Sequence, residues 1–143
     1  MVRWILVAAG IAAATAVVAQ TDVITERKEL MKANGRAARL GGQMAKGEEP
    51  FTLEKARQVY ASFENASVKF GNLFPEDSKT GGNTRALPAV WTENADFKAK
   101  LAAWNQDIKQ AEADTKDLDT FKVSFGKVTQ ACGGCHRKYQ APQ

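Results

Sequence analysis

The sequence predicts an all-α protein, an antiparallel four-helix bundle with a long connection between the second and third helices. Apolar residues recur at three- and four-residue spacing along four segments, and few stretches alternate as strands do. Short joints separate the first two segments and the last two, whereas a long glycine- and proline-containing stretch separates the middle two. Helices joined by short loops pack as antiparallel neighbours.

Length and composition fit one globular domain. The chain has 143 residues, of which 44% are hydrophobic and 25% charged, and its formal net charge is +4. Acidic and basic residues are interspersed, and no basic tract carries interleaved aromatic residues. We therefore expect no nucleic-acid partner.

Residues 1–19 have the pattern of a cleaved signal peptide. Arg3 is their only charge, and the apolar stretch that follows is too short for a comfortable membrane span and ends in the small residues of positions 17–19. Cleavage near Ala19 leaves residues 20–143 as the mature domain. We expect that domain to be exported into an oxidising space and not embedded in the membrane.

The first helix is expected from about Thr21 to Lys46, before Gly47 and Pro50. A Gly-Gly pair at positions 41–42 weakens the prediction of its last turn, because glycine is a poor helix former. The apolar stripe of this helix consists of Val23, Leu30, Ala33, Ala37, Leu40 and Met44.

The second helix is expected to begin after Thr52, a residue type that caps helices well, and to end by Gly71 and Pro75. Its apolar stripe consists of Leu53, Ala56, Tyr60, Phe63 and Phe70. The segment that follows, FPEDSKTGGNTRALPAVW at positions 74–91, predicts an extended connection. Loops of this length inside a compact domain are uncommon and often functional.

The third helix is expected to begin after Thr92 or Asn94, and the fourth near Asp117 or Asp119. The third carries an apolar stripe of Phe97, Leu101, Trp104, Ile108 and Ala111. The fourth carries Leu118, Phe121, Phe125, Val128, Cys132, Cys135 and Tyr139, so both cysteines continue the inward face of a bundle helix. The aromatic residues expected in the core are Phe63, Trp91, Phe97, Trp104, Phe121 and Phe125.

Both cysteines and the only histidine of the chain occur in the segment Cys132-Gly-Gly-Cys135-His136. This Cys-x-x-Cys-His pattern is the attachment site of c-type haem. On a helix the three side chains share one face, so two thioether bonds would hold the porphyrin there. His136 would then bind the iron.

Three other uses of the motif fit less well. A disulfide between Cys132 and Cys135 would close a loop too short to constrain the chain, and a helix does not favour it. A thioredoxin-like redox pair belongs at the start of a helix, whereas this pair is at the end of one. A zinc site lacks a fourth ligand, because the chain has a single histidine.

The second axial position of the iron is open to methionine, lysine, water or no ligand. Apart from the initiator, the methionines are Met31 and Met44. Met44 continues the apolar stripe and fits the usual role of core filling. Met31 is one position beyond the stripe residue Leu30, near the start of its helix, where it can lie opposite the end of the fourth helix.

Taken together, these features resemble the class II c-type cytochromes, the cytochrome c′ superfamily. The resemblance covers nearly all of residues 20–143 and includes the carboxy-terminal Cys-x-x-Cys-His and a Pro-x-x-Trp at positions 88–91. The segment ELMKANGRAARLGGQMAKGEEPF is similar to the first helix of the low-spin cytochrome c-556 branch, whose methionine binds the iron. It implies one covalently attached haem c per chain with His136 and Met31 as axial ligands. Arg27 matches a basic position that lies beside a haem propionate in cytochrome c′ proteins, so the resemblance to them implies the same contact here. We also expect Trp91 and Phe125 to touch the haem.

The function implied is that of a periplasmic electron-transfer protein that is not an enzyme. Its partners would be redox proteins, and it would be a monomer or a homodimer. The alternative is a high-spin cytochrome c′ that binds or scavenges nitric oxide or carbon monoxide. Such proteins usually have a bulky apolar residue at the position of Met31 and leave that face of the iron without a ligand.

Overall fold

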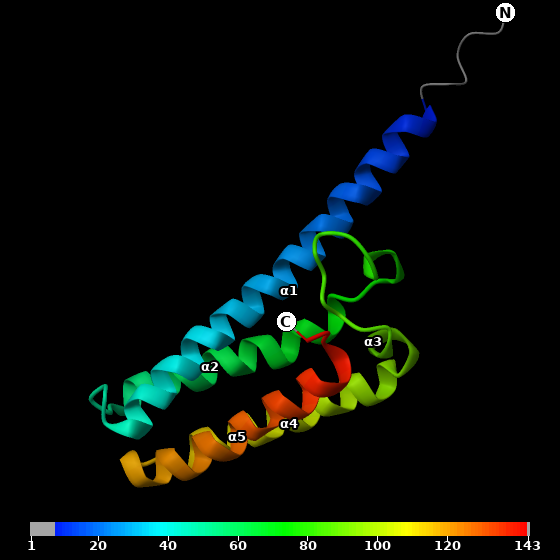
Figure 1. The fold of residues 1–143 in the computed structure, drawn as a ribbon. Coiled ribbons are helices and arrows are strands. Elements are labelled where there is room, and N and C mark those ends of the chain that lie inside the picture. The colour runs from blue at the N-terminus through cyan, green and yellow to red at the C-terminus, as the bar shows by residue number, and fades with distance from the viewer. Residues whose placement is uncertain (1–7, 143) are drawn as a thin grey trace, which may run out of the picture.

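The computed structural model describes the backbone of residues 8–142 and the side chains of residues 22–142. Within these residues four long helices form an antiparallel bundle, as the sequence predicts (Figure 1). They are α1 (Ala8–Lys46), α2 (Leu53–Lys69), α4 (Asn94–Asp114) and α5 (Leu118–Tyr139). Three short helical segments lie in the connection from α2 to α4, namely η1 (Phe70–Asn72), η2 (Glu76–Ser78) and α3 (Ala89–Thr92).

The bundle has two distinct ends. At the hairpin end, residues 47–52 join α1 to α2 and residues 115–117 join α4 to α5. At the connection end, residues 70–93 pass from α2 to α4 and meet the carboxy-terminal residues of the chain. Each helix packs on two neighbours: α1 on α2 and α5, and α4 on α2 and α5. The amino-terminal part of α1 extends beyond the other helices (Figure 1).

Local sequence fixes the starts of α2 and α5 as predicted. The hydroxyl of Thr52 accepts a hydrogen bond from the backbone N–H of Lys55 at 3.1 Å. Asp117 accepts from the backbone N–H of Thr120 at 2.9 Å, and the Thr120 hydroxyl accepts from the Asp117 N–H at 3.0 Å. The second pair is a capping box, which satisfies backbone donors that a helix start leaves unpaired.

Aromatic packing fills the interior between the helices. The rings of Phe63, Phe97, Phe121 and Phe125 are buried, which confirms four of the six predicted core aromatics. Trp91 and Trp104 are only partly buried, and each indole N–H donates to a backbone carbonyl. A tryptophan ring has one polar N–H that needs a hydrogen-bond partner. It therefore lies at the boundary of a core more often than at the centre of the core.

Several local expectations differ from the structure. Helix α1 includes the alanine-rich segment before Thr21, back to Ala8, the first described residue, in keeping with the high helix propensity of alanine. It continues without interruption through Gly41 and Gly42. The connection at 74–91 contains η2 and α3 and is not extended throughout. Leu53 is 40% exposed, since it is the first residue of α2 and lies beyond the core.

The inward face of α1 is also shifted from the predicted stripe. Ile24 and Arg27 are buried, whereas Val23, Ala33 and Leu40 are only partly buried. The buried set steps through Ile24, Arg27, Leu30, Ala37, Gly41 and Met44. That spacing is the 3.6-residue period with a charged residue inside it.

The predicted signal peptide, residues 1–19, lies partly outside the described residues, and its cleavage stays a prediction. In the part of the chain that the structure describes, no helix has the length and hydropathy needed to cross a membrane.

Candidate functional site

The Cys-x-x-Cys-His motif lies in the last two turns of α5, at the connection end of the bundle. Cys132 and Cys135 are free thiols and are half-buried, and burial is the main cause that raises the pKa of each. His136 is at the surface. Partial burial, and then the charge of Arg85, lowers the pKa of its imidazole, which favours the neutral form that binds metals.

The inward face of α5 extends to the motif as predicted. Phe121, Phe125, Val128 and Tyr139 are buried along this face. Cys135 packs against the cluster of Val90, Phe97, Leu101 and Tyr139. The cysteines are therefore the half-exposed continuation of an otherwise buried face, where a bound group can cover them.

Backbone pairing holds the chain beyond the motif against the connection. The N–H of Leu87 donates to the Tyr139 carbonyl at 2.9 Å, and the N–H of Ala141 donates to the Arg85 carbonyl at 2.8 Å. The Nε of Arg85 in turn donates to the Ala141 carbonyl at 3.1 Å. These bonds fix the end of α5 to the segment that precedes α3.

A second set of contacts fixes the end of α5 to the start of α4. Asp96 accepts hydrogen bonds from Lys138 Nζ at 2.8 Å and from the Tyr139 hydroxyl at 2.5 Å. Lys138 also pairs with Glu93 at 2.5 Å. The bond from Lys138 is the main cause that lowers the pKa of Asp96. The motif is thus followed at once by residues anchored on two other elements.

Arg27 is a buried cation in α1, with 5% of its surface exposed. Its Nε donates to the Leu73 carbonyl at 2.5 Å, its Nη1 donates to the Ser78 carbonyl at 3.2 Å and to Thr84 Oγ1 at 3.5 Å, and its Nη2 donates to the Ser78 hydroxyl. The guanidinium also stacks 4.0 Å from the centre of the Phe74 ring. Burial lowers its pKa to about 10, so the group is still charged at neutral pH.

The structure therefore gives Arg27 a role that the sequence did not reveal. It ties the connection to the middle of α1, and bonds to described residues use four of its five N–H groups. The sequence signal was its position three residues before Leu30, on the inward face. The predicted propionate contact has one N–H left to serve it and stays a prediction.

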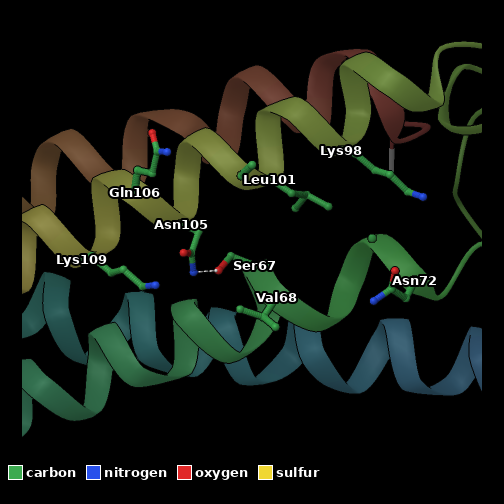
Figure 2. A pocket seen from close by; sticks show the side chains of 10 residues that line it. Ser67, Val68, Asn72, Lys98, Leu101, Asn105, Gln106 and Lys109 are labelled. Carbon is green, nitrogen blue, oxygen red and sulfur yellow. Dashed lines mark hydrogen bonds between the residues drawn. The ribbon is translucent and has the colours of Figure 1, made fainter.

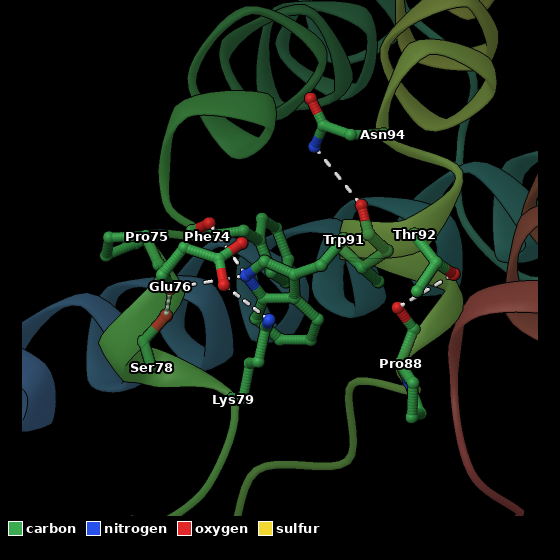
Figure 3. Close-up of polar contacts among 10 residues, drawn as sticks. Phe74, Pro75, Glu76, Ser78, Lys79, Pro88, Trp91, Thr92 and Asn94 are labelled. Atoms are coloured by element: carbon green, nitrogen blue, oxygen red, sulfur yellow. Dashed lines mark hydrogen bonds and ion pairs between the residues drawn. The ribbon is translucent and has the colours of Figure 1, made fainter.

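Trp91 and Phe125, both expected to touch the haem, lie in different parts of the bundle. The indole N–H of Trp91 donates to the carbonyls of Phe74 at 2.9 Å and Pro75 at 3.2 Å, which fixes the connection (Figure 3). Phe125 stacks on Phe121, with ring centres 5.2 Å apart, within the core that also contains Phe63. Neither arrangement tests a haem contact.

The register of α1 against α5 relates Met31 to His136. The backbone of Gly41 in α1 lies against the ring of Phe125 in α5. Met31 is ten residues before Gly41, and His136 is eleven residues after Phe125. At 1.5 Å of rise per residue these steps are about 15 Å and about 16.5 Å in the same direction, because the helices are antiparallel. Met31 and His136 are therefore at nearly the same level of the bundle.

Met44 is at the other end of α1. It lies three residues beyond Gly41 toward the hairpin end, is fully buried, and belongs to the core that contains Phe121 and Phe125. The prediction that Met44 fills the core is confirmed. Its level on α1 is far from that of the cysteines.

Asn34, which the sequence reasoning did not single out, lies beside Met31. Its Nδ2 is 4.0 Å from the Met31 sulfur, and both side chains are half-buried. Its carbonyl oxygen Oδ1 is buried and has no hydrogen-bond partner among the described residues. The sequence signal was the three-residue spacing of Met31 and Asn34, which puts them on one helix face.

The residues present fit a covalently held haem. Two free thiols lie on one face of α5, an imidazole follows them, and a thioether with an unpaired amide oxygen beside it lies at the same level of α1. The zinc alternative finds no ligand set, since the described residues contain no group of three His, Cys, Asp or Glu side chains able to hold a metal ion.

A separate open groove of about 490 Å³ runs between α2 and α4 (Figure 2). Its lining combines apolar residues such as Val68 and Leu101 with polar ones. Among the polar residues, Ser67 and Asn105 are hydrogen-bonded to each other at 2.7 Å. None of the predicted site residues lines this groove.

Comparison with known proteins agrees with this geometry. The family model described as Cytochrome C' matches residues 22–140. The cytochrome c′ of Rhodopseudomonas palustris is 38% identical over 124 residues, which cover 87% of this chain and 85% of that protein. The cytochrome c-556 of the same organism is 30% identical over 145 residues, covering 98% and 97%.

Solved structures give the same result. The structure of cytochrome c′ from Rhodopseudomonas palustris superimposes with a TM-score of 0.82 at 35% identity, covering 85% of this chain and 98% of that one. The structural model of oxidised cytochrome c556 from that organism gives a TM-score of 0.77 at 27% identity, with the same coverage. The chain therefore belongs to the cytochrome c′ family, non-enzymatic proteins with one haem c bound covalently through a carboxy-terminal Cys-x-x-Cys-His, here with Cys132 and Cys135.

Proposed function

We propose that the protein is a periplasmic electron carrier of the cytochrome c-556 type, with a low-spin haem iron held between His136 and Met31. The observation that carries this proposal is the shared level of the two residues on α1 and α5, set by the contact of Gly41 with Phe125. Met44 has no such relation to the motif, because it is buried in the core at the hairpin end.

The haem supplies one-electron redox chemistry when it is bound. The residues of this chain attach, orient and enclose it. A thioether opposite an imidazole favours the reduced iron more than harder ligand pairs do. With both axial positions filled by protein, no position is left for a substrate, which suits electron transfer without bond chemistry.

The periplasmic location rests on residues 1–19 and on the chemistry of the motif. Attachment through Cys132 and Cys135 needs an exported chain, and the amino-terminal segment has the charge and length of a signal peptide. The similarity to cytochrome c-556, which extends over 98% of this chain, supports the electron-transfer assignment. The redox partner would be another exported protein.

A high-spin protein that binds nitric oxide or carbon monoxide is the second candidate. The observation in its favour is the higher identity to a cytochrome c′ than to a cytochrome c-556, 38% against 30%. In this case Met31 would pack beside the iron without binding it. The bundle serves both functions equally, so the fold does not separate them.

The absorption spectrum of the oxidised holoprotein separates the two candidates. A six-coordinate iron with a methionine ligand gives a low-spin spectrum with a sulfur-to-iron charge-transfer band. A high-spin spectrum without that band would reject the electron-carrier proposal. A His136→Ala variant checks the proximal ligand: haem should stay attached through the cysteines, and the low-spin spectrum should be lost.

A further inference from the structure

We propose that Asn34 is a positioning residue for Met31, donating a hydrogen bond to the thioether sulfur and thereby selecting the sulfur lone pair that faces the iron. The inference rests on the proposed function, because it assumes that Met31 is the axial ligand. It adds a residue and a role to that assignment.

The first observation is the placement of the amide. Asn34 follows Met31 by three residues in α1, so the two side chains emerge on the same face. The nitrogen Nδ2 lies 4.0 Å from the sulfur Sδ. Of the two ends of the amide, the nitrogen carries the donors, and the thioether sulfur can only accept.

The second observation is the unpaired oxygen of the same amide. Asn34 Oδ1 is buried and has no partner among the described residues. A buried carbonyl without a hydrogen bond costs free energy, and an apolar side chain of similar shape would avoid that cost. A polar group retained under this cost indicates a role other than the stability of the bundle.

The chemistry of a thioether gives that role. The sulfur has two lone pairs, and the iron can take either one, with the methyl group pointing in opposite directions in the two cases. Methionine is flexible enough to supply both arrangements. A hydrogen bond from Asn34 to one lone pair leaves the other for the iron, which is how outer residues orient metal ligands.

The two roles of Asn34, in packing and in positioning, predict different results. If the amide only fills space in α1, its replacement should change stability and leave the bond between sulfur and iron as it was. If it positions Met31, its replacement by leucine should loosen that bond although the bundle becomes no less stable. The test therefore needs a measure of the bond that is independent of unfolding.

The experiment compares oxidised wild-type holoprotein with Asn34→Leu, which keeps the shape and removes the donor, and with Asn34→Gln, which keeps a donor. Asn65→Leu is the matched control, since Asn65 is exposed on α2. Imidazole titration measures how readily an external ligand displaces the methionine. The NMR shifts of the haem methyl groups report whether the sulfur has one arrangement or two in exchange. Urea unfolding measures stability.

We expect imidazole to bind Asn34→Leu about tenfold more tightly than wild type, as is typical when a residue that orients a metal ligand is removed. The haem methyl pattern should change from a single arrangement to an exchanging one. Asn34→Gln should recover part of both effects, and Asn65→Leu should resemble wild type. If the Asn34→Leu protein does not accumulate, Asn34→Ala takes its place in the comparison.

Two outcomes would overturn the inference, and they can be told apart. If wild type has the charge-transfer band and loses it in Met31→Leu, but Asn34→Leu matches wild type in imidazole affinity and methyl shifts, this inference fails and the proposed function stands. If wild type lacks the band, or Met31→Leu retains it, the proposed function fails and takes this inference with it.

Discussion

The ring of Phe125 in α5 occupies the space next to the backbone of Gly41 in α1. A Cβ added at Gly41 would lie 2.3 Å from Phe125 Cε2, far inside normal contact distance. The ring is itself stacked on Phe121 and Phe63, so it has little freedom to withdraw. The absence of a side chain at position 41 therefore sets how α1 and α5 meet.

Gly41→Ala should destabilise the protein in spite of the higher helix propensity of alanine. Forcing a methyl group into this contact costs about 1–3 kcal/mol in the free energy of unfolding. Gly42→Ala is the control, because nothing lies within 4 Å of a Cβ at that position. It should stabilise the protein by about 0.5–1 kcal/mol. Urea unfolding measures the stability of both variants. If Gly41→Ala changes the free energy of unfolding by the same amount and in the same direction as Gly42→Ala, the proposed contact is contradicted.

This contact also marks where prediction from the sequence ended. The bundle, the caps at Thr52 and Asp117 and the inward face of α5 follow from local patterns, and the structure confirms them. Local propensity alone makes the pair at positions 41–42 an argument against the last turn of α1, because glycine is a poor helix former. Its real role depends on a ring 84 residues away in sequence (125 − 41).

The same reason explains the missed role of Arg27. Its partners Leu73 and Ser78 are 46 and 51 residues away, so no local pattern announces them. A charged residue on the inward face was the only sequence signal, and the family resemblance assigned it to a propionate instead. Asn34 was missed because its significance is an unpaired oxygen, which only the surroundings reveal.

Arg27→Met should release the connection from α1. The substitution keeps much of the apolar stem and removes the donors, which leaves the carbonyls of Leu73 and Ser78 without their partner. The expected loss is about 2–6 kcal/mol in the free energy of unfolding, as each of these two unpaired buried carbonyls costs about 1–3 kcal/mol. Arg39→Met, at an exposed position of the same helix, is the control. If Arg27→Met loses no more stability than Arg39→Met, the hydrogen bonds from Arg27 to the connection contribute nothing to the free energy of unfolding.

Asp96→Asn should make the protein less sensitive to acid. Lys138 lowers the pKa of Asp96 below its ordinary 3.8 in the folded protein. A depressed carboxyl pKa stabilises the fold above the unfolded value, and this contribution disappears as the pH falls through the folded value. Wild type should thus lose more stability between pH 7 and pH 3 than Asp96→Asn does. Thermal unfolding at both pH values checks this, with Asp114→Asn on the same helix as the control.

The choice of function depends on Met31, and Met31→Leu tests it against Met44→Leu. A thioether has no charge to hold it on iron, so its bond depends on the bundle placing it. Leucine and methionine have similar volumes, and such swaps usually cost less than about 1.5 kcal/mol, so both variants should fold.

Met31→Leu should leave the iron five-coordinate, lower its reduction potential and let carbon monoxide bind the reduced form, which wild type should exclude. Met44→Leu should do none of this, because Met44 is buried among the aromatic residues of the hairpin end, about 20 Å along α1 from Met31 (13 residues at about 1.5 Å each). Carbon monoxide binding and the oxidised spectrum are the measurements.

If Met44→Leu opens the iron and Met31→Leu does not, the wrong methionine has been assigned, and the register of α1 against α5 does not determine the ligand. If neither variant differs from wild type, the sixth ligand is not a methionine. The gas-binding function then becomes the better account of the same bundle.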